Sequence, residues 1–236
     1  MATATILTVG NEIVSGDVAN TNAAWLARRL EQLGVRIRLV AALPDEIDEI
    51  AGFLRERAPA TDFLLVTGGL GGTPDDLTRE AVAVAFGVAQ VEVPEVAASL
   101  RARFERDPEY AARWAMLQAG SRPLENPRGG APGFVIENVY VFPGLPAEME
   151  AMFDAIADEF RGGAPIAVWR CAYRTRESEI VGVLVETGER WPEVLVGSYP
   201  TFEPPHPQVE VVLKSSHADS LAEATAFVES ALAAKR

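Results

Sequence analysis

Residues 62–78 read DFLLVTGGLGGTPDDLT, and this stretch decides the fold class. Residues 63–66 are apolar throughout, which is typical of a central strand buried on both faces. The glycines that follow predict a loop, and the next segment predicts a helix that runs to Phe86 and ends at Gly87. A buried strand, a glycine-rich loop and a helix in this order are typical of a largely parallel α/β sheet.

The segments before this stretch repeat the alternation. Short apolar runs predict strands over residues 5–9 and 35–43, and an amphipathic stretch predicts a helix over 45–58. Another helix begins after Asn20 or Thr21, either of which can cap it, and Gly34 stands where a left-handed residue ends a helix. The first ninety residues therefore predict successive βαβ units.

The rest of the chain divides at a linker over residues 161–165. Before it we expect a helical stretch over 94–118 with a break near Asp107, a loop over 120–133, a hairpin over 134–142 and a helix from Pro146 to Phe160. After it we expect a strand over 166–173, a helix over 177–186, strands over 195–199 and 209–213, and a helix over 220–233. This pattern predicts an α/β domain over 1–163 and a small α+β domain over 166–236.

Composition excludes several classes of protein. The 236 residues include 34 Asp and Glu against 21 Lys and Arg, a formal net charge of −13, and 48% are hydrophobic, so the chain can bury a core. The acidity argues against nucleic acid as a partner. The single cysteine, Cys171, cannot form an internal disulfide, and neither a signal peptide nor a long apolar run is present. We expect a cytoplasmic protein with no membrane partner.

The glycine-rich loop is the strongest chemical signal. Glycines let the backbone approach a ligand and turn its N–H groups inward, and the following helix N-terminus favours an anion such as phosphate. The loop is not a P-loop, because no Lys-Ser or Lys-Thr closes it, and Pro74 breaks the dinucleotide fingerprint. The alternative is that the glycines only make a turn while Asp75 and Asp76 favour the helix dipole. The loop alone leaves both readings open.

Other acidic side chains follow the neighbouring strands. Glu12 follows the first strand and Asp45 follows the second, so in an open α/β sheet both meet the loop at the carboxyl edge. Adjacent carboxylates beside a phosphate repel it unless a cation lies between them, and Mg²⁺ commonly takes one or two carboxylates plus phosphate oxygens. Considered by itself, the position of Asp45 before a predicted helix favours a helix cap over a metal ligand.

At this point a family resemblance becomes specific. Residues 9–17 (VGNEIVSGD), 20–22 (NTN), 44–45 (PD), 67–78, 125–127 (ENP), 131–134 (APGF) and 142–149 (FPGLPAEM) follow one another in the order of the molybdopterin-binding domain family. The version is similar to the front part of the competence/damage-inducible CinA proteins. Residues 166–236 resemble the small KH-like domain that follows in those proteins.

The resemblance implies a three-layer αβα fold with a mostly parallel central sheet that binds a nucleotide-like or pterin phosphate. Related adenylyltransferases use Mg²⁺ with acidic residues at the positions of Asp45 and Asp76, whereas CinA-type relatives hydrolyse a pyrophosphate such as that of ADP-ribose or FAD. We therefore expect Mg²⁺ or another divalent cation at Asp45 and Asp76, with Asp75 and Glu12 as further catalytic residues. The expected substrate-binding residues are Gly10, Asn11, Ser15, Gly16, Asn20, Asn22, Thr67, Gly68, Gly69, Gly71, Gly72, Thr73, Pro143, Gly144, Pro146 and Glu148.

Two positions depart from the family pattern. Gly72 stands where the family usually has Pro, which loosens the loop, and Asn11 stands where Asp is commoner, which removes one charge. The deamidase domain of many CinA proteins has no counterpart before the chain ends at Arg236, so amide hydrolysis of nicotinamide mononucleotide is not expected. No Gly-x-x-Gly occurs over 166–236, so the small domain is expected to be structural or dimer-forming, without RNA binding.

The remaining conspicuous residues suggest no chemistry. We expect His206 and His217 to be solvated, Cys171 to be buried, and the four tryptophans to serve packing or an interface. Three functions stay open: a metal-dependent nucleotide pyrophosphatase, which the motif details favour; a molybdopterin-binding or adenylating enzyme; and a non-catalytic nucleotide-binding module. The resemblance also implies a homo-oligomer, with a dimer expected.

Overall fold

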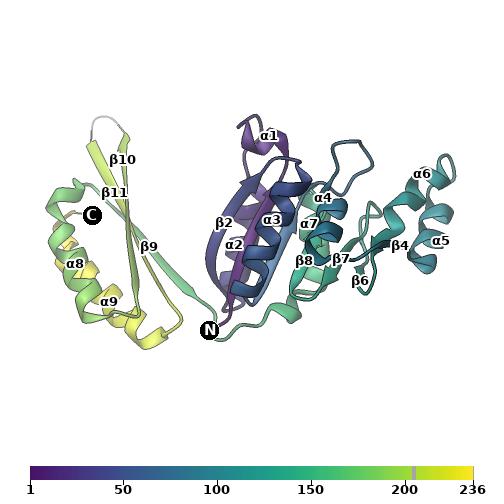
Figure 1. The fold of residues 1–236 in the computed structure, drawn as a ribbon. Coiled ribbons are helices and arrows are strands. Elements are labelled where there is room, and N and C mark those ends of the chain that lie inside the picture. The colour runs from purple at the N-terminus through teal and green to yellow at the C-terminus, as the bar shows by residue number, and fades with distance from the viewer. Residues whose placement is uncertain (204–205, 236) are drawn as a thin grey trace. The chain divides into compact units, whose positions relative to one another are not determined.

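The computed structural model describes residues 1–203 and 206–235 (Figure 1). The chain divides into two compact units, Met1–Gly163 and Ala164–Arg236. In the first unit a six-stranded sheet has the order β2-β1-β3-β8-β7-β6. The strands are β1 (Thr3–Val9), β2 (Arg36–Leu43), β3 (Phe63–Thr67), β6 (Arg122–Leu124), β7 (Gly133–Ile136) and β8 (Val139–Phe142). Strands β2, β1, β3 and β8 run parallel, while β7 and β6 extend the sheet antiparallel.

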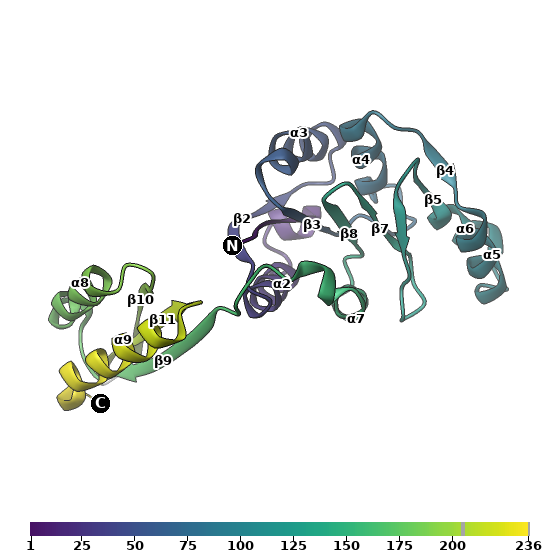
Figure 2. The same ribbon diagram turned by 90° about the horizontal axis from the view of Figure 1, so that it is seen from below.

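Helices cover both faces of this sheet, which gives the expected three layers (Figure 2). Helices α2 (Thr21–Gln32) and α7 (Pro146–Ala155) lie on one face, and α3 (Ile47–Arg57) and α4 (Thr78–Phe86) lie on the other. Successive residues of β3 alternate between the two cores: Leu65 packs with Leu26 and Phe153, and Leu64 packs with Ile50 and Val82. Strand β3 is therefore buried on both faces, as its apolar run predicts.

The local signals in the sequence explain the helix boundaries. The Asn20 side chain accepts a hydrogen bond from the Ala23 N–H (3.1 Å) and caps α2. Gly34 and Gly87, which follow α2 and α4, have φ angles of 77° and 66°, the left-handed conformation expected of them. Helix α3 begins later than predicted, and Glu46 stands at its N-cap without a side-chain cap bond. The alternative reading of Asp45 as a helix cap is therefore wrong.

Short elements account for the other differences. Residues 94–118 hold α5 (Pro94–Arg103), α6 (Pro108–Ala112), a 3-10 turn (Arg113–Ala115) and then a strand, β5 (Met116–Gln118), which pairs with β4 (Gln90–Glu92). The predicted loop over 120–133 contains β6, and a short helix, α1 (Asn11–Val14), follows β1. Predicting a helix over 116–118 was wrong because three-residue strands carry no periodicity of their own.

The hairpin over 134–142 is confirmed, with Ile136 opposite Val139 and Glu137 at the turn with a φ of 51°. A 3-10 turn, Ala157–Phe160, ends the helical segment that starts with α7. Phe160 is fully buried and stacks on Phe153, with 4.9 Å between the ring centroids. The end of the first unit is thereby anchored in its own core.

The second unit is an α+β domain. Strands β9 (Ala167–Tyr173), β10 (Leu195–Glu203) and β11 (His206–Ser215) form an antiparallel sheet in the order β10-β11-β9. Helices α8 (Val181–Arg190) and α9 (Ala218–Ala231) contribute to its core, and 3-10 turns occupy Glu177–Glu179 and Ala233–Lys235. Cys171 is partly buried, not fully buried as expected. His217 is exposed, whereas the side chain of His206 lies outside the described residues.

Within residues 1–203 and 206–235, no helix combines the length and the apolar character that crossing a membrane requires.

Candidate active site

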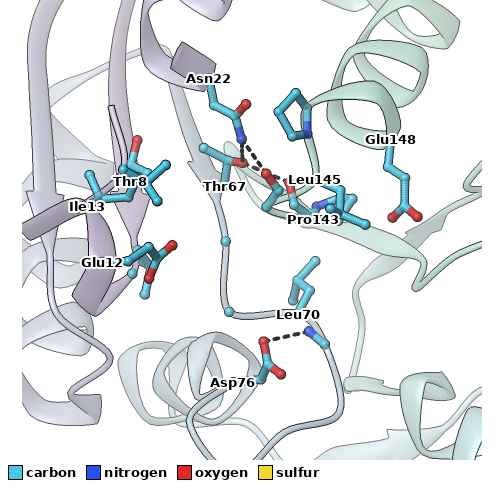
Figure 3. A pocket seen from close by; sticks show the side chains of 18 of the residues that line it. Thr8, Glu12, Ile13, Asn22, Thr67, Leu70, Asp76, Pro143, Leu145 and Glu148 are labelled. Atoms are coloured by element: carbon cyan, nitrogen blue, oxygen red, sulfur yellow. Dashed lines mark hydrogen bonds between the residues drawn. The ribbon is translucent and has the colours of Figure 1, made fainter. Parts of the chain in front are cut away.

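A cavity of about 490 Å³ opens at the carboxyl edge of the sheet, where β1, β3 and β8 end (Figure 3). Its walls come from the segments after these strands, from the start of α2 and from the start of α7. The lining includes most residues expected to bind substrate: Gly10, Asn20, Asn22, Thr67, Gly68, Gly69, Gly71, Pro143, Gly144, Pro146 and Glu148. The parallel strands thus bring separate sequence motifs to one place, as such sheets do.

Four carboxylates line one part of this cavity: Glu12, Asp45, Asp75 and Asp76. Burial raises the pKa of Asp45 above its ordinary value, and the negative charges of Glu12, Asp75 and Asp76 raise it further, while a hydrogen bond from the Asn11 backbone acts in the opposite direction. The acidic residues that follow different strands are therefore close enough to repel one another electrostatically.

Asn11 and Asp45 join the loops after β1 and β2. The Asn11 N–H donates to Asp45 Oδ2 at 2.9 Å, and the Asp45 N–H donates to Asn11 Oδ1 at 3.4 Å. Asn11 does not line the cavity, so its side chain positions Asp45 without contributing to the wall. Asn11 makes this contact without a negative charge, so an asparagine where the family more often has aspartate is compatible with positioning Asp45.

The backbone of the glycine-rich loop lies in close contact with β1 and with the start of α4. Gly68 has a φ of 107°, and a Cβ there would overlap the carbonyl oxygen of Val9 in β1. The hydroxyl of Thr78, at the start of α4, donates to the Gly68 carbonyl at 2.8 Å, and its N–H donates to the Gly69 carbonyl at 3.2 Å. Only glycine fits at position 68, and α4 holds the loop directly.

Asp76 holds the middle of the same loop. Its Oδ1 accepts from the Gly71 N–H at 2.8 Å, and its Oδ2 accepts from the Thr73 N–H at 2.8 Å and from the Thr73 hydroxyl at 2.5 Å. The carboxylate thus occupies two of the N–H donors expected to cradle phosphate (Figure 3 shows the bond to Gly71). The N–H groups of Gly71 and Thr73 are therefore already used within the loop, and a phosphate would have to find its donors elsewhere in it.

A second hydrogen-bond network fixes the opposite wall. Asn22 Nδ2 donates to Thr67 Oγ1 at 3.0 Å and to the Gly144 carbonyl at 2.8 Å, and the Thr67 hydroxyl donates to the Pro143 carbonyl at 2.8 Å (Figure 3). Asn22 is 8% exposed, and its Oδ1 is buried without a hydrogen-bond partner. An unpaired buried acceptor beside a cavity is unusual and suits a ligand that donates a hydrogen bond.

Five expected ligand residues do not line the cavity: Asn11, Ser15, Gly16, Gly72 and Thr73. The Ser15 hydroxyl donates to Asp17 at 2.7 Å, so it is used locally. Sequence reasoning in turn missed Leu70 and Trp114, both of which line the cavity. Trp114 was expected to serve packing or an interface; Trp25 and Trp191 do pack, against Phe153 and Phe227. It lies in the segment between β4 and β5, whose approach to the loop no local motif indicates.

Gly72 contacts that segment. A Cβ at Gly72 would overlap the Tyr110 hydroxyl and would lie 3.1 Å from Trp114 Nε1. Tyr110 and Trp114 pack edge to face with ring centroids 5.9 Å apart, and Trp114 Nε1 is buried without a partner. The glycine at this position therefore leaves room for Tyr110, in addition to the looser loop expected from the sequence.

Among the described residues that line the cavity, oxygen atoms are the metal ligands on offer, because no His or Cys is in the lining. Among the described residues, no three His, Cys, Asp or Glu side chains are grouped closely enough to hold a metal ion by themselves. Asp45 and Asp76 could each contribute a carboxylate oxygen, with further ligands coming from water or substrate, as is usual for Mg²⁺.

An α/β sheet with a glycine-rich loop and acidic residues at its carboxyl edge defines a class of small-molecule-binding domain. Residues 5–162 match the family described as probable molybdopterin binding domain, and the chain belongs to this family. Within it the chain is CinA-like. Residues 170–236 match the family described as FAD synthase, middle domain.

Several relatives are similar to the chain. A protein of Archaeoglobus fulgidus is 38% identical over 202 residues, covering 83% of this chain and 84% of the relative. A CinA-like protein of Frankia casuarinae is 38% identical over 206 residues, but the match covers 79% of this chain and only 48% of that protein. The crystal structure of CinA from Thermoplasma acidophilum is 32% identical with a TM-score of 0.64, covering 67% of this chain and 98% of that one.

Proposed function

We propose that the protein hydrolyses the pyrophosphate bond of a dinucleotide-like compound such as ADP-ribose or FAD, with a divalent cation. The observation that carries the proposal is the shared cavity: Glu12, Asp45, Asp75 and Asp76 line it together with the glycine-rich loop. N–H donors suit phosphate oxygens, and clustered carboxylates suit the cation that must accompany them.

The residues present fit such a cation. Asp45 has a raised pKa because burial and three neighbouring carboxylates disfavour its charge, and a bound cation would remove that repulsion. Its Oδ2 accepts one hydrogen bond from Asn11, so the carboxylate is held in place while Oδ1 stays available. Asp45 and Asp76 would hold the ion, which when bound would neutralise charge on the phosphate oxygens.

Backbone and side-chain groups of the protein would bind the phosphate oxygens and activate the water molecule. Gly69 and Leu70 bring their backbone to the cavity wall, where N–H groups can bind the non-bridging oxygens. Glu12 would orient a water molecule and take its proton as the water oxygen attacks phosphorus. The bond between phosphorus and the bridging oxygen then breaks, and the bridging oxygen leaves with the second phosphate. For ADP-ribose the products are AMP and ribose 5-phosphate.

The second unit supports a nucleotide as the ligand class. Residues 170–236 are similar to the middle domain of FAD synthase, a protein whose name refers to a flavin dinucleotide. A second candidate function rests on the first unit, whose family is described as probable molybdopterin binding domain. In that case the same cavity would bind a pterin phosphate or adenylate it with ATP.

Thermal unfolding separates these functions. The protein is heated with ADP-ribose, FAD, ATP or a pterin, each with and without Mg²⁺ or Mn²⁺. A ligand that binds only the native state raises the transition temperature by mass action. The proposal predicts a metal-dependent increase with ADP-ribose or FAD. An increase only with the pterin favours the second function, and no response to any nucleotide contradicts the proposal.

A further inference from the structure

Arg79 lies beneath the glycine-rich loop, on the first turn of α4. It is only 7% exposed, and it does not line the cavity. Its Nη1 donates to the Leu70 carbonyl at 2.8 Å, and its Nη2 donates to the Gly71 carbonyl at 2.7 Å. One guanidinium group thus holds two consecutive carbonyls of the loop.

This arrangement is costly for a cation. Burial lowers the pKa of Arg79, whereas the charges of Glu80 and Asp76 favour its protonated form. No ion pair to Arg79 occurs within the described part of the chain, so the loop carbonyls are its direct partners. A buried charge without a paired carboxylate destabilises a protein unless its hydrogen bonds compensate. The fold retains it beneath the loop that carries Asp75 and Asp76 to the cavity.

The geometry of the peptide group determines the direction in which the N–H groups of the loop point. In a trans peptide the C=O and N–H bonds point to opposite sides. Because Arg79 draws the carbonyls of Leu70 and Gly71 toward itself, the N–H groups of Gly71 and Gly72 must face away from it. The Gly71 N–H donates to Asp76 Oδ1 at 2.8 Å. One peptide group is therefore held by a cation at its oxygen and by an anion at its N–H.

We propose that Arg79 is a positioning residue: it fixes the 70–72 backbone so that the Gly71 N–H stays on Asp76 and holds this carboxylate at the cavity wall. It also adds a permanent positive charge behind a wall that carries four carboxylates. Hydrogen bonds in a chain polarise one another, so a cation on the carbonyl strengthens the N–H on the other side as a donor. The inference rests on the proposed phosphate-containing ligand for its purpose, but its geometry can be tested without one.

Arg55 provides a matched control. It lies on α3, and its side chain also donates to two consecutive carbonyls, those of Val84 (2.6 Å) and Ala85 (3.3 Å). These carbonyls belong to the last turn of α4, and Arg55 is exposed and does not line the cavity. Arg79→Gln and Arg55→Gln therefore each remove an arginine that donates to two consecutive carbonyls, but the carbonyls held by Arg79 belong to the loop and those held by Arg55 belong to α4.

Amide hydrogen exchange of the full-length protein tests the geometry. In Arg79→Gln the Gly71 N–H should exchange about tenfold faster, the fold-change expected from loss of one hydrogen bond's support. The Ala81 N–H within α4 should stay protected, and Arg55→Gln should leave Gly71 unchanged. Arg79→Lys keeps the charge but not the paired contact, and it should lie between wild type and Arg79→Gln. Unchanged Gly71 exchange in both Arg79 variants would overturn the inference.

Binding of ADP-ribose with Mg²⁺ then separates positioning from plain stability. Calorimetry below the unfolding transition should give about tenfold weaker binding for Arg79→Gln, partial recovery for Arg79→Lys and no change for Arg55→Gln. Equal affinity in Arg79→Gln and wild type would also overturn the inference. If wild type itself binds neither ADP-ribose nor inorganic pyrophosphate, the proposed function fails, and Gly71 exchange still decides whether Arg79 holds the loop. Should Arg79→Gln not fold, the same comparisons use Arg79→Lys.

Discussion

Asn11 and Asp45 hold each other across two loops: the Asn11 N–H donates to the Asp45 carboxylate, and the Asn11 side chain accepts from the Asp45 N–H. This reciprocal contact orients Asp45 without using its second oxygen. It also identifies the variant that removes charge while changing the geometry least, because an amide oxygen at position 45 can accept the same hydrogen bond from Asn11.

Asp45→Asn should keep the fold and lose the cation. Because its side chain is uncharged, Mg²⁺ should no longer raise the thermal transition in the presence of ADP-ribose, and metal-dependent turnover should fall by at least about a hundredfold. Differential scanning calorimetry with and without Mg²⁺ measures the first effect. An Asp45→Asn protein that responds to Mg²⁺ as wild type does would remove Asp45 from the metal site.

Asp76→Asn tests the metal site less cleanly than Asp45→Asn, because it also disturbs the loop. Asp76 accepts hydrogen bonds from the N–H groups of Gly71 and Thr73 and from the Thr73 hydroxyl, so an amide group at one of its oxygen positions would place N–H against N–H. We expect this variant to lose activity together with order in the loop. Its Gly71 amide should exchange faster, whereas in Asp45→Asn it should not.

Gly72 and Tyr110 should be energetically coupled. Gly72→Ala places a methyl group against the Tyr110 hydroxyl, the far end of a 42% exposed side chain that can move aside, and should destabilise the protein by about 0.5–1 kcal/mol. Tyr110→Ala removes the obstacle, so the alanine at position 72 should cost less in that background. Urea denaturation of the two single variants and the double variant measures the coupling. Additive effects would show that Tyr110 is not the reason for the glycine.

Asn22 should matter for ligand binding as well as for stability. Asn22→Ala leaves the Gly144 carbonyl without its donor and should cost about 1–3 kcal/mol. Asn138 is a matched control, since its Nδ2 donates to the carbonyls of Ala58 and Thr61 at 2.8 Å each and lies away from the cavity. Both alanine variants should be destabilised, but only Asn22→Ala should bind ADP-ribose more weakly. Equal binding by both variants would contradict a ligand role for Asn22.

The sequence allowed the sheet and its flanking helices to be predicted because their signals are local. The apolar run in β3, the cap at Asn20 and the glycines at 34 and 87 can each be recognised from a short stretch of neighbouring residues. Strands β5 and β6 were not predictable in this way, because three residues show no period and their pairing partners lie elsewhere in the chain.

The cavity was partly predictable for a related reason. Residues that follow parallel strands meet at one edge, so Glu12, Asp45 and the loop could be placed together from strand order. The roles of single side chains could not be predicted. A charged residue on the first turn of a helix, such as Arg79, reads as solvent-exposed, and Trp114 reaches the cavity only through the packing of its own segment.

Product analysis tests the central claim most directly. The protein is incubated with ADP-ribose and Mg²⁺ in water enriched in oxygen-18, and the products are followed by phosphorus NMR and mass spectrometry, with Asp45→Asn as the control. Hydrolysis at the pyrophosphate predicts AMP and ribose 5-phosphate, with one heavy oxygen on one of the two new phosphate groups and no products from the control. ADP-ribose and FAD that both stay intact with Mg²⁺ or Mn²⁺, or equal product formation by Asp45→Asn, would contradict the account.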